Sequence, residues 1–402
     1  MDRPNKGISR RGLFFAVAGA VAVTSVTHPT RAAAINEKSP PGPARLAERA
    51  DLAERAIMER HVRTLWWQSG MQLGTLHWPS SLFDRLLLGR WCYWWQAHLL
   101  DCTVDAAYRA RTPERIDRIS AIARGIHTRN LTSWTNGYCD DMSWLVLALE
   151  RADRLLGVRC GNAVPKLRTA LLDGWNPAVG AVPWKIGHDY YSTSGIGPTG
   201  IAMARLGELA HAERLADFLN TRLRDSESGL IFDGLHERSG LVNHTLLTYC
   251  QGVAIGLETE LAQRTTNSEH RDRAAALVTA TADRLTDGGV IVGRAGNDSG
   301  LFMGILARYL AHTALALGDP TAAQLVHASA RAAWSNRAEV NGLPLFGAHW
   351  NRPVTAPAGL ETLARAADTS RPSRPNESRD LSIQLSAWML LEADYQLTSA
   401  GH

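Results

Sequence analysis

The chain has 402 residues, of which 45% are hydrophobic and 20% charged, a globular composition with enough core to need no disulfide staples. Its net charge is +4, but residues 1–34 contain five basic residues and one acidic residue, so the remaining chain is neutral. This distribution excludes a general electrostatic affinity for nucleic acid.

Residues 1–34 have the pattern of an export signal. Arg10 and Arg11 precede the apolar run Leu13–Val26, and small residues follow at 32–34. This order is typical of a secretory signal peptide, and the paired arginines indicate the twin-arginine export machinery. Because the run is too short to span a bilayer comfortably, we expect no integral membrane span in the mature chain. The predicted location is secreted or cell envelope, in a bacterium.

Five cysteines, an odd number without CxxC spacing, argue against a zinc site and against a disulfide scaffold. We expect most of them to be buried thiols. One disulfide stays open as an alternative, with no pair preferred.

Residues 35–43 are rich in proline and glycine and indicate a linker. Beyond them the apolar residues recur with helical spacing almost throughout. The pattern predicts about twelve helices, over residues 44–69, 89–110, 113–129, 140–157, 160–174, 194–209, 210–224, 244–263, 268–287, 299–318, 319–337 and 379–396. Residues 341–379, rich in proline and arginine, are expected to form an irregular surface excursion.

Twelve helices taken in order make six hairpins, which can close into an all-α (α/α)6 barrel. Odd helices would form one ring and even helices the other, in a single domain over residues 44–402. An α-solenoid is the alternative, but no repeat of fixed period is visible. In such a barrel the loops and helix N-termini at one end build a single cleft.

Asp140 and Asp141 stand together at the start of the predicted helix 140–157. Aspartate is a common helix cap, but a cap needs only one carboxylate and two adjacent charges repel. Glycoside hydrolysis needs two carboxyl groups, and roughly 5–5.5 Å between them favours retention of configuration. Mutual repulsion would keep one carboxyl protonated, as an acid catalyst requires.

Aromatic and polar residues accompany this pair as candidate sugar contacts. Ten of the thirteen tryptophans precede residue 190. Each one alone is most often a core residue, but flat rings beside polar groups also form platforms for sugars. The candidate substrate-binding residues are Trp94, Trp95, Gln96, Trp134, Tyr138, Trp184, Asp233, Tyr249 and Gln251.

These stretches resemble glycoside hydrolase family 76, the endo-α-1,6-mannanases with an (α/α)6 barrel. The resemblance runs from about Trp94 to the last helix. It is carried by residues 138–144 (YCDDMSW), 229–234 (GLIFDG), 248–253 (TYCQGV), 301–305 (LFMGI) with Arg308-Tyr309, and 382–386 (SIQLS). Two positions depart from it: Cys250 stands where the family usually has Asn, and Met303 where Lys is common. These departures bear on subsites and substrate length, while the aspartate pair is intact.

The resemblance implies a retaining hydrolase of α-1,6-mannan or lipomannan-type polysaccharide, with Asp140 as nucleophile and Asp141 as acid/base. It also implies that Asp233 contacts the substrate. Two alternatives stay open. One is another (α/α)6 carbohydrate enzyme, such as an unsaturated glucuronyl hydrolase or a transglycosidase; the other is a non-catalytic glycan-binding envelope protein.

One motif has the form of a dinucleotide-binding sequence but lacks the context that such a site requires. Residues 195–200 match GxGxxG, but no strand or βαβ unit surrounds them, and Pro198 suits the first turn of a helix. Histidines lack metal-ligand spacing, and neither HExxH nor GxSxG occurs. We therefore predict no cofactor and no catalytic metal.

Overall fold

Twelve long helices make up most of the computed structural model, which describes residues 41–294, 297–355 and 379–402. They are α1 (Pro43–Arg60), α3 (Tyr93–Arg109), α4 (Pro113–Arg129), α5 (Cys139–Leu156), α6 (Ala163–Asp173), α7 (Thr193–Arg205), α8 (Leu209–Arg222), α9 (Thr248–Arg264), α10 (Glu269–Arg284), α11 (Phe302–Leu317), α12 (Pro320–Asn336) and α14 (Leu381–Ser399). They belong to one compact unit, Pro40–His402. The predicted signal peptide, most of the linker and much of the predicted surface excursion lie outside the described residues.

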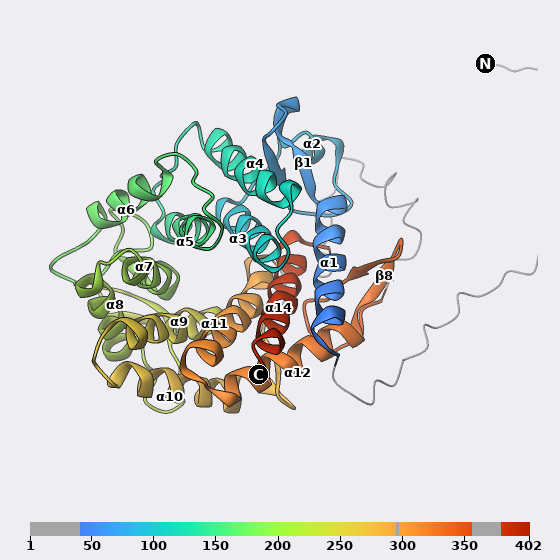
Figure 1. The fold of residues 1–402 in the computed structure, drawn as a ribbon. Coiled ribbons are helices and arrows are strands. Elements are labelled where there is room, and N and C mark those ends of the chain that lie inside the picture. The colour runs from blue at the N-terminus through green and yellow to red at the C-terminus, as the bar shows by residue number, and fades with distance from the viewer. Residues whose placement is uncertain (1–40, 295–296, 356–378) are drawn as a thin grey trace, which may run out of the picture. The chain divides into compact units, whose positions relative to one another are not determined.

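The helices form two concentric rings (Figure 1). Helices α3, α5, α7, α9, α11 and α14 contact one another in a closed inner ring, and α4, α6, α8, α10, α12 and α1 pack outside them in that order. The sequence explains the layers. Inner helix α14 buries nearly every residue from Leu381 to Asp394, whereas outer helix α10 buries only one face, around Ala274 and Leu277. The predicted (α/α)6 barrel is confirmed.

The pairing of the helices differs from the prediction by one position. Odd and even helices do occupy separate rings, but the consecutive hairpins run from α3–α4 to α11–α12, and α1 packs against the last helix, α14. Arg109 of α3 joins this closure, because its guanidinium contacts Asp51 of α1 at 2.8 Å and Glu392 of α14 at 2.9 Å. The two ends of the chain therefore close the ring.

Local signals set where the helices begin and end. Thr112 accepts a hydrogen bond from the Arg115 amide at the start of α4, and Asp319 does the same for the Ala322 amide at the start of α12. Gly157 ends α5 with a φ of 69°, a left-handed conformation that favours glycine. Such caps explain why most predicted boundaries fall within a few residues of the observed ones.

Short strands and turns connect the helices, and two predicted helices are shorter than expected because strands take up part of their range. The strands are β1 (Val62–Thr64) with β2 (Gln72–Gly74), β3 (Tyr190–Ser192), β4 (Phe232–His236) and β5 (Leu241–Leu246) in one antiparallel sheet, β6 (Thr286–Asp287) with β7 (Val290–Ile291), and β8 (Ala338–Val340) with β9 (Leu343–Leu345). Two 3₁₀ turns, η1 (Leu65–Trp67) and η2 (Asn297–Leu301), and the short helix α2 (Leu82–Arg85) complete the elements. The predicted helix 44–69 ends at Arg60 because Val62 and Thr64 favour an extended strand, and the predicted helix 244–263 begins only at Thr248, after β5.

Within the described residues one stretch, Asp298–Leu317, is long and apolar enough to span a bilayer, but 67% of its most apolar window is buried in the barrel. It comprises η2 and inner helix α11, so its hydrophobicity reflects the core. All five cysteines are free thiols, and Cys102, Cys139 and Cys250 are buried as predicted. The open disulfide does not form.

Candidate active site

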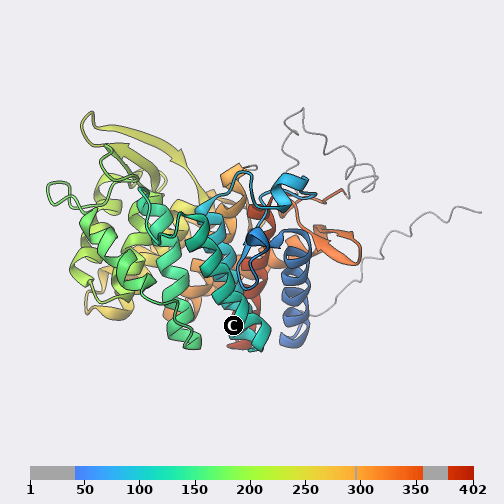
Figure 2. The ribbon, with the colours of Figure 1, turned by 90° about the horizontal axis from the view of Figure 1, so that it is seen from above.

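A cavity of about 450 Å³ lies at the end of the barrel where the inner helices begin. We call it the carboxylate cavity. It is lined by Trp91, Cys92, Tyr93, Trp94, Tyr138, Asp140, Asp141, Trp144, Trp184, Ser194, Asp233, Leu247, Tyr249, Asp298, Phe302 and Ile305. In Figure 2 the yellow-green strands β4 and β5 rise at one end of the vertical helices, and β4 supplies Asp233 to the cavity. Its size falls within the roughly 300–1,000 Å³ typical of small-molecule sites.

Helix N-termini converge on this cavity, as the barrel prediction expects. The first turns of α3, α5, α7, α9 and α11 all supply lining residues. Unpaired amide groups and the helix dipole make such ends electropositive, so they favour carboxylates in their ionised form. Several acidic side chains can therefore gather here although no lysine or arginine is among the described lining residues.

Asp140 occupies the first turn of α5 and is held by N–H donors. Its Oδ2 accepts a hydrogen bond from Nε1 of Trp184 at 2.9 Å, and its Oδ1 accepts one from the Asp141 amide at 2.9 Å. Burial raises the pKa of Asp140 to about 6, and these two donors oppose the rise. The arrangement favours a carboxylate with a fixed orientation.

Asp141 is held differently, through the side chain of Asn136, whose Nδ2 donates to Oδ2 at 2.8 Å. Burial, and secondly the charge of Asp140, raise the pKa of Asp141 to about 7. The two adjacent carboxyls thus have unequal environments. Because burial and their mutual repulsion raise the pKa of both carboxyls, the pair retains a proton to higher pH than two isolated aspartates would.

A third carboxylate, Asp233 of β4, is fixed by hydroxyl and amide donors. The Tyr190 hydroxyl donates to Oδ2 at 2.6 Å, the Tyr249 hydroxyl to Oδ1 at 2.7 Å, and Nδ2 of Asn243 to Oδ2 at 2.9 Å. Tyr190 and Asn243 are absent from the sequence prediction. They come from the sheet β3–β4–β5, which brings together segments more than forty residues apart.

Asp298, from η2, is a fourth carboxyl in the cavity and was missed by the sequence prediction. Burial raises its pKa, and its charge in turn raises the pKa values of Asp140 and Asp141. It belongs to no recognisable motif, and the one available signal was its place just before the stretch Leu301–Ile305.

Aromatic rings form much of the cavity wall. Trp94 stacks on Phe302 with ring centroids 6.4 Å apart, and Tyr138 meets Trp184 edge-on at 5.0 Å. Trp94, Tyr138, Trp184, Asp233 and Tyr249 are thus the predicted substrate-binding residues that the structure places in the cavity.

Gln96 and Gln251, also predicted to bind substrate, have a structural role instead. Each is buried and joins an inner helix to a backbone segment through both ends of its amide. Gln96 accepts from the Gly74 amide at 2.7 Å and donates to the Gly74 carbonyl at 2.9 Å; Gln251 does the same with Ile231, at 2.8 and 2.9 Å. Since both ends of each amide are engaged in this way, neither side chain is placed to hold a sugar hydroxyl.

Trp95 and Trp134 likewise do not line the cavity. Trp95 is buried in the core, edge-on to Trp94. The carbonyl of Trp134 accepts from the Tyr93 hydroxyl at 2.6 Å, and its ring packs on His127. Both tryptophans support the cavity wall from behind.

Cys250 and Met303, the two departures from the family pattern, also do not line the carboxylate cavity. Both residues are buried in the first turns of their helices, Cys250 in α9 and Met303 in α11.

In the part of the chain that the structure describes, no group of three or more His, Cys, Asp or Glu side chains is arranged to hold a metal ion.

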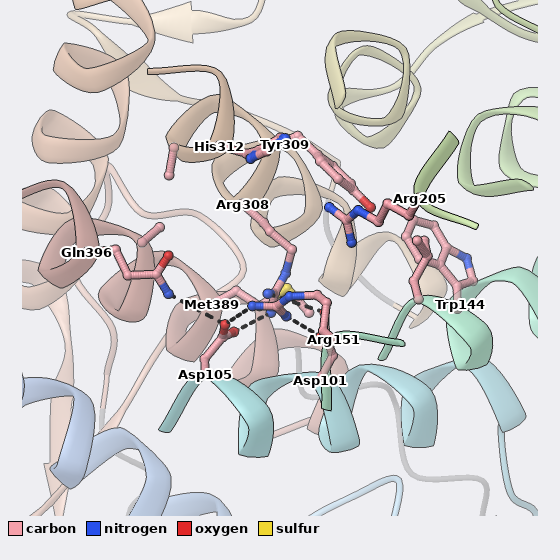
Figure 3. A pocket seen from close by; sticks show the side chains of 13 residues that line it. Asp101, Asp105, Trp144, Arg151, Arg205, Arg308, Tyr309, His312, Met389 and Gln396 are labelled. Carbon is pink, nitrogen blue, oxygen red and sulfur yellow. Dashed lines mark hydrogen bonds and ion pairs between the residues drawn. The ribbon is translucent and has the colours of Figure 1, made fainter. Parts of the chain in front are cut away.

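Deeper along the same inner helices lies a second cavity of about 70 Å³, which we call the ion-pair cavity (Figure 3). Arg151 of α5 and Arg308 of α11 both contact Asp101 and Asp105 of α3 there. Trp144 lines both cavities. The Arg308-Tyr309 motif therefore belongs to this inner network and not to the carboxylate cavity.

Comparison with known proteins identifies the family. The profile of glycosyl hydrolase family 76 matches residues 46–371. No curated protein matches the sequence.

Solved structures agree with this match. The α-1,6-mannanase from Salegentibacter sp. HEL1_6 superposes with a TM-score of 0.73 at 25% identity, over 88% of this chain and 99% of that one. A Listeria innocua protein gives 0.73 at 23% identity, over 89% and 99%. A family 76 mannosidase from Bacteroides thetaiotaomicron gives 0.68 at 14% identity, over 88% and 98%. With the family profile covering most of the chain, the protein belongs to glycosyl hydrolase family 76 and is a glycoside hydrolase.

Proposed function

We propose that the protein cleaves α-1,6-mannosidic linkages in mannan or lipomannan-type polysaccharide with retention of configuration. The observation that carries this proposal is the unequal pair Asp140 and Asp141 in an aromatic-lined cavity. The similarity to the Salegentibacter enzyme supports this choice of substrate. It is an α-1,6-mannanase, and inactive variants with two adjacent aspartates replaced were crystallised with α-1,6-mannotetrose and α-1,6-mannotriose.

In the first step, the ionised Asp140 attacks the anomeric carbon while Asp141 donates its proton to the departing glycosidic oxygen. This forms a mannosyl ester on Asp140 and releases the first product with a new hydroxyl group. The two N–H donors on Asp140 orient the attacking carboxylate, and the raised pKa of Asp141 keeps it protonated for this step.

In the second step, Asp141, now a carboxylate, accepts a proton from water as that water attacks the same carbon. The ester bond breaks, Asp140 returns to its ionised form, and the sugar leaves with its original configuration. Asp233, held by three donors, is placed to accept hydrogen bonds from sugar hydroxyls, while Trp94 and Trp184 offer flat faces for the rings.

Export is part of the proposal. The arginine pair and apolar run at residues 10–26 support twin-arginine export to the cell envelope or the medium. A folded enzyme with free cysteines suits a route that carries folded proteins.

The test is hydrolysis of a linear α-1,6-mannan of defined length, with products followed by chromatography and their first-formed anomer by NMR. We expect retained configuration, and a loss of about a thousandfold or more in kcat for Asp140→Asn and Asp141→Asn. Asp319→Asn is the matched control, because it also changes an acid at a helix start but lies in outer helix α12 and keeps a good cap. Inverted product, cleavage of an unsaturated uronide in place of mannan, or binding without turnover would overturn the proposal.

A further inference from the structure

The protein exposes an unusual concentration of large apolar side chains beside the carboxylate cavity. Five of the nine that the described residues expose fall within residues 62–91 and 122–134. They are Trp67, Leu82, Phe83, Leu88 and Leu131, with exposed fractions of 77, 74, 56, 45 and 90%. We call this set the apolar rim. Clustered exposure of this kind marks interaction surfaces.

Arg129, at the end of α4, brings the three segments of the rim together. Its guanidinium lies over the rings of Trp66 at 5.8 Å and Trp91 at 5.6 Å, and it donates to the Gly89 carbonyl at 3.0 Å. Trp67, Leu88 and Leu131 are one or two residues away from these contacts. Figure 1 shows β1, α2 and α4 side by side. Trp91, which Arg129 contacts, also lines the carboxylate cavity, so the rim lies next to the wall of that cavity.

The backbone holds two of these side chains in place at an energetic cost. Trp67 and Leu131 have φ values of 61° and 54°, in the left-handed region that residues other than glycine rarely adopt. Strained positions that persist at a surface point to a function for the side chains they present.

Positive charge surrounds the rim. Residues 62–91 and 122–134 contain the arginines Arg63, Arg85, Arg90, Arg124 and Arg129 against one acidic residue, Asp84, although the chain beyond residue 34 is neutral as a whole. Arg85, Arg90 and Arg124 are exposed. Leucine and aromatic side chains beside arginines match the interface of an anionic bilayer, where apolar groups insert and cations meet lipid headgroups.

We propose that the apolar rim docks on an anionic lipid surface, which presents the mouth of the carboxylate cavity to glycans anchored in that membrane. The glycan part rests on the proposed function; the docking does not. Charge argues against a second copy of the chain, because a symmetric contact would place the three exposed arginines, Arg85, Arg90 and Arg124, against those of the other copy. An uncharged glycan would gain little from the arginines.

The test is flotation of residues 40–402 with lipid vesicles. These residues form one compact unit, and omitting residues 1–39 removes the apolar run at 13–26, which would bind lipid by itself. We expect binding to phosphatidylcholine vesicles that contain about one-third phosphatidylglycerol. Binding to vesicles of phosphatidylcholine alone, or to the mixed vesicles at high salt, should be weaker by about tenfold or more.

Two double variants address the rim directly. Phe83→Ser with Leu131→Ser, and Arg85→Gln with Arg90→Gln, should each weaken vesicle binding about tenfold without lowering the Tm, because these side chains are exposed. The controls are Leu241→Ser and Arg159→Gln, which change exposed residues elsewhere and should bind like the parent.

The remaining outcomes each decide the proposal. Binding that ignores phosphatidylglycerol, or survives both double variants, would overturn it. So would a dimer that Phe83→Ser dissociates, or a loss of binding on deletion of residues 358–376, which lie in the proline- and arginine-rich stretch 341–379. Slower cleavage of soluble mannan by the Phe83→Ser, Leu131→Ser variant would overturn it as well. The proposal would be supported if the Phe83→Ser, Leu131→Ser variant cleaved bilayer-anchored glycan more slowly than the parent but cleaved soluble mannan at the parent's rate. If mannan is not cleaved at all, vesicle binding still tests the docking separately.

Discussion

The two cavities of the barrel use the same inner helices to hold acids among different partners. In the carboxylate cavity the acids meet indole, amide and hydroxyl donors, and its described lining residues include no lysine or arginine. In the ion-pair cavity every acid faces a guanidinium (Figure 3). Burial raises the pKa of Asp141 to about 7, whereas the arginines overcome burial and lower that of Asp101 to about 2.

Helix α5 contributes to both cavities, with Asp140 and Asp141 in its first turn and Arg151 about three turns later. The comparison shows that the partners of a buried acid, and not burial alone, set its pKa. It also separates two roles: the paired acids stabilise the fold, and the unpaired acids are available for proton transfer.

The largest expected effect concerns stability at the ion-pair cavity. Arg308→Met leaves Asp101 and Asp105 with one arginine in place of two, and we expect the free energy of unfolding to fall by about 3–5 kcal/mol. Urea unfolding measures it. The control Arg159→Met removes an exposed ion pair with Asp153 and should change stability by less than about 0.5 kcal/mol. Equal effects of the two variants would mean that the inner network is not structural.

An intermediate effect is expected on catalysis when the donor to Asp140 is removed. Trp184→Phe deletes the Nε1–H bond, so the pKa of Asp140 should rise and kcat/KM should fall about tenfold, most strongly on the acid side of the pH profile. Trp175→Phe is the control, because Trp175 packs on His211 outside the cavity. A uniform loss at all pH values would contradict this role.

A smaller effect, of opposite sign to Arg308→Met, is expected for Asp141→Asn. The folded protein binds a proton at Asp141 more tightly than the unfolded chain, so ionisation costs stability as the pH rises from 3.8 through about 7. Above pH 7 the Tm of the variant should therefore exceed that of the parent by roughly 2 °C or more. Near pH 4 the two Tm values should differ little. Scanning calorimetry at both pH values tests this, and a lower Tm at pH 8 would contradict it.

The smallest effect distinguishes Asp298 from the proposed catalytic pair, Asp140 and Asp141. Asp298→Asn removes a charge that raises the pKa values of both aspartates, so the alkaline limb of kcat/KM should move to lower pH. We expect about a twofold loss on that side, in keeping with roughly 0.5 kcal/mol of charge interaction near water. A loss as large as that of Asp141→Asn would instead make Asp298 a catalytic residue.

Much of the architecture was predictable because its signals are local. The 3.6-residue spacing, the caps at Thr112 and Asp319, and the breakers at Gly157 and Gly318 place most helices without any long-range information. The pair Asp140–Asp141 was equally visible, since adjacent acids at a helix start need no partner from elsewhere to be noticed.

Side-chain roles across the ring were less predictable. Gln96 and Gln251 stand within two residues of an aromatic side chain in sequence, a pattern compatible with sugar ligands, yet both bind backbone. Asp298 carries no motif, yet it reaches the cavity.

Local sequence predicts most of the helices, their order, the acid pair at the start of α5 and the neutral charge of the chain beyond residue 34. The closure of the ring by α1 against α14, the place of Arg308 in the inner network, and the donors Tyr190 and Tyr249 on Asp233 depend on the tertiary structure. The reason is geometric. Helix formation depends on neighbours within a few turns, whereas a cavity collects side chains from five helices that meet only when the ring closes.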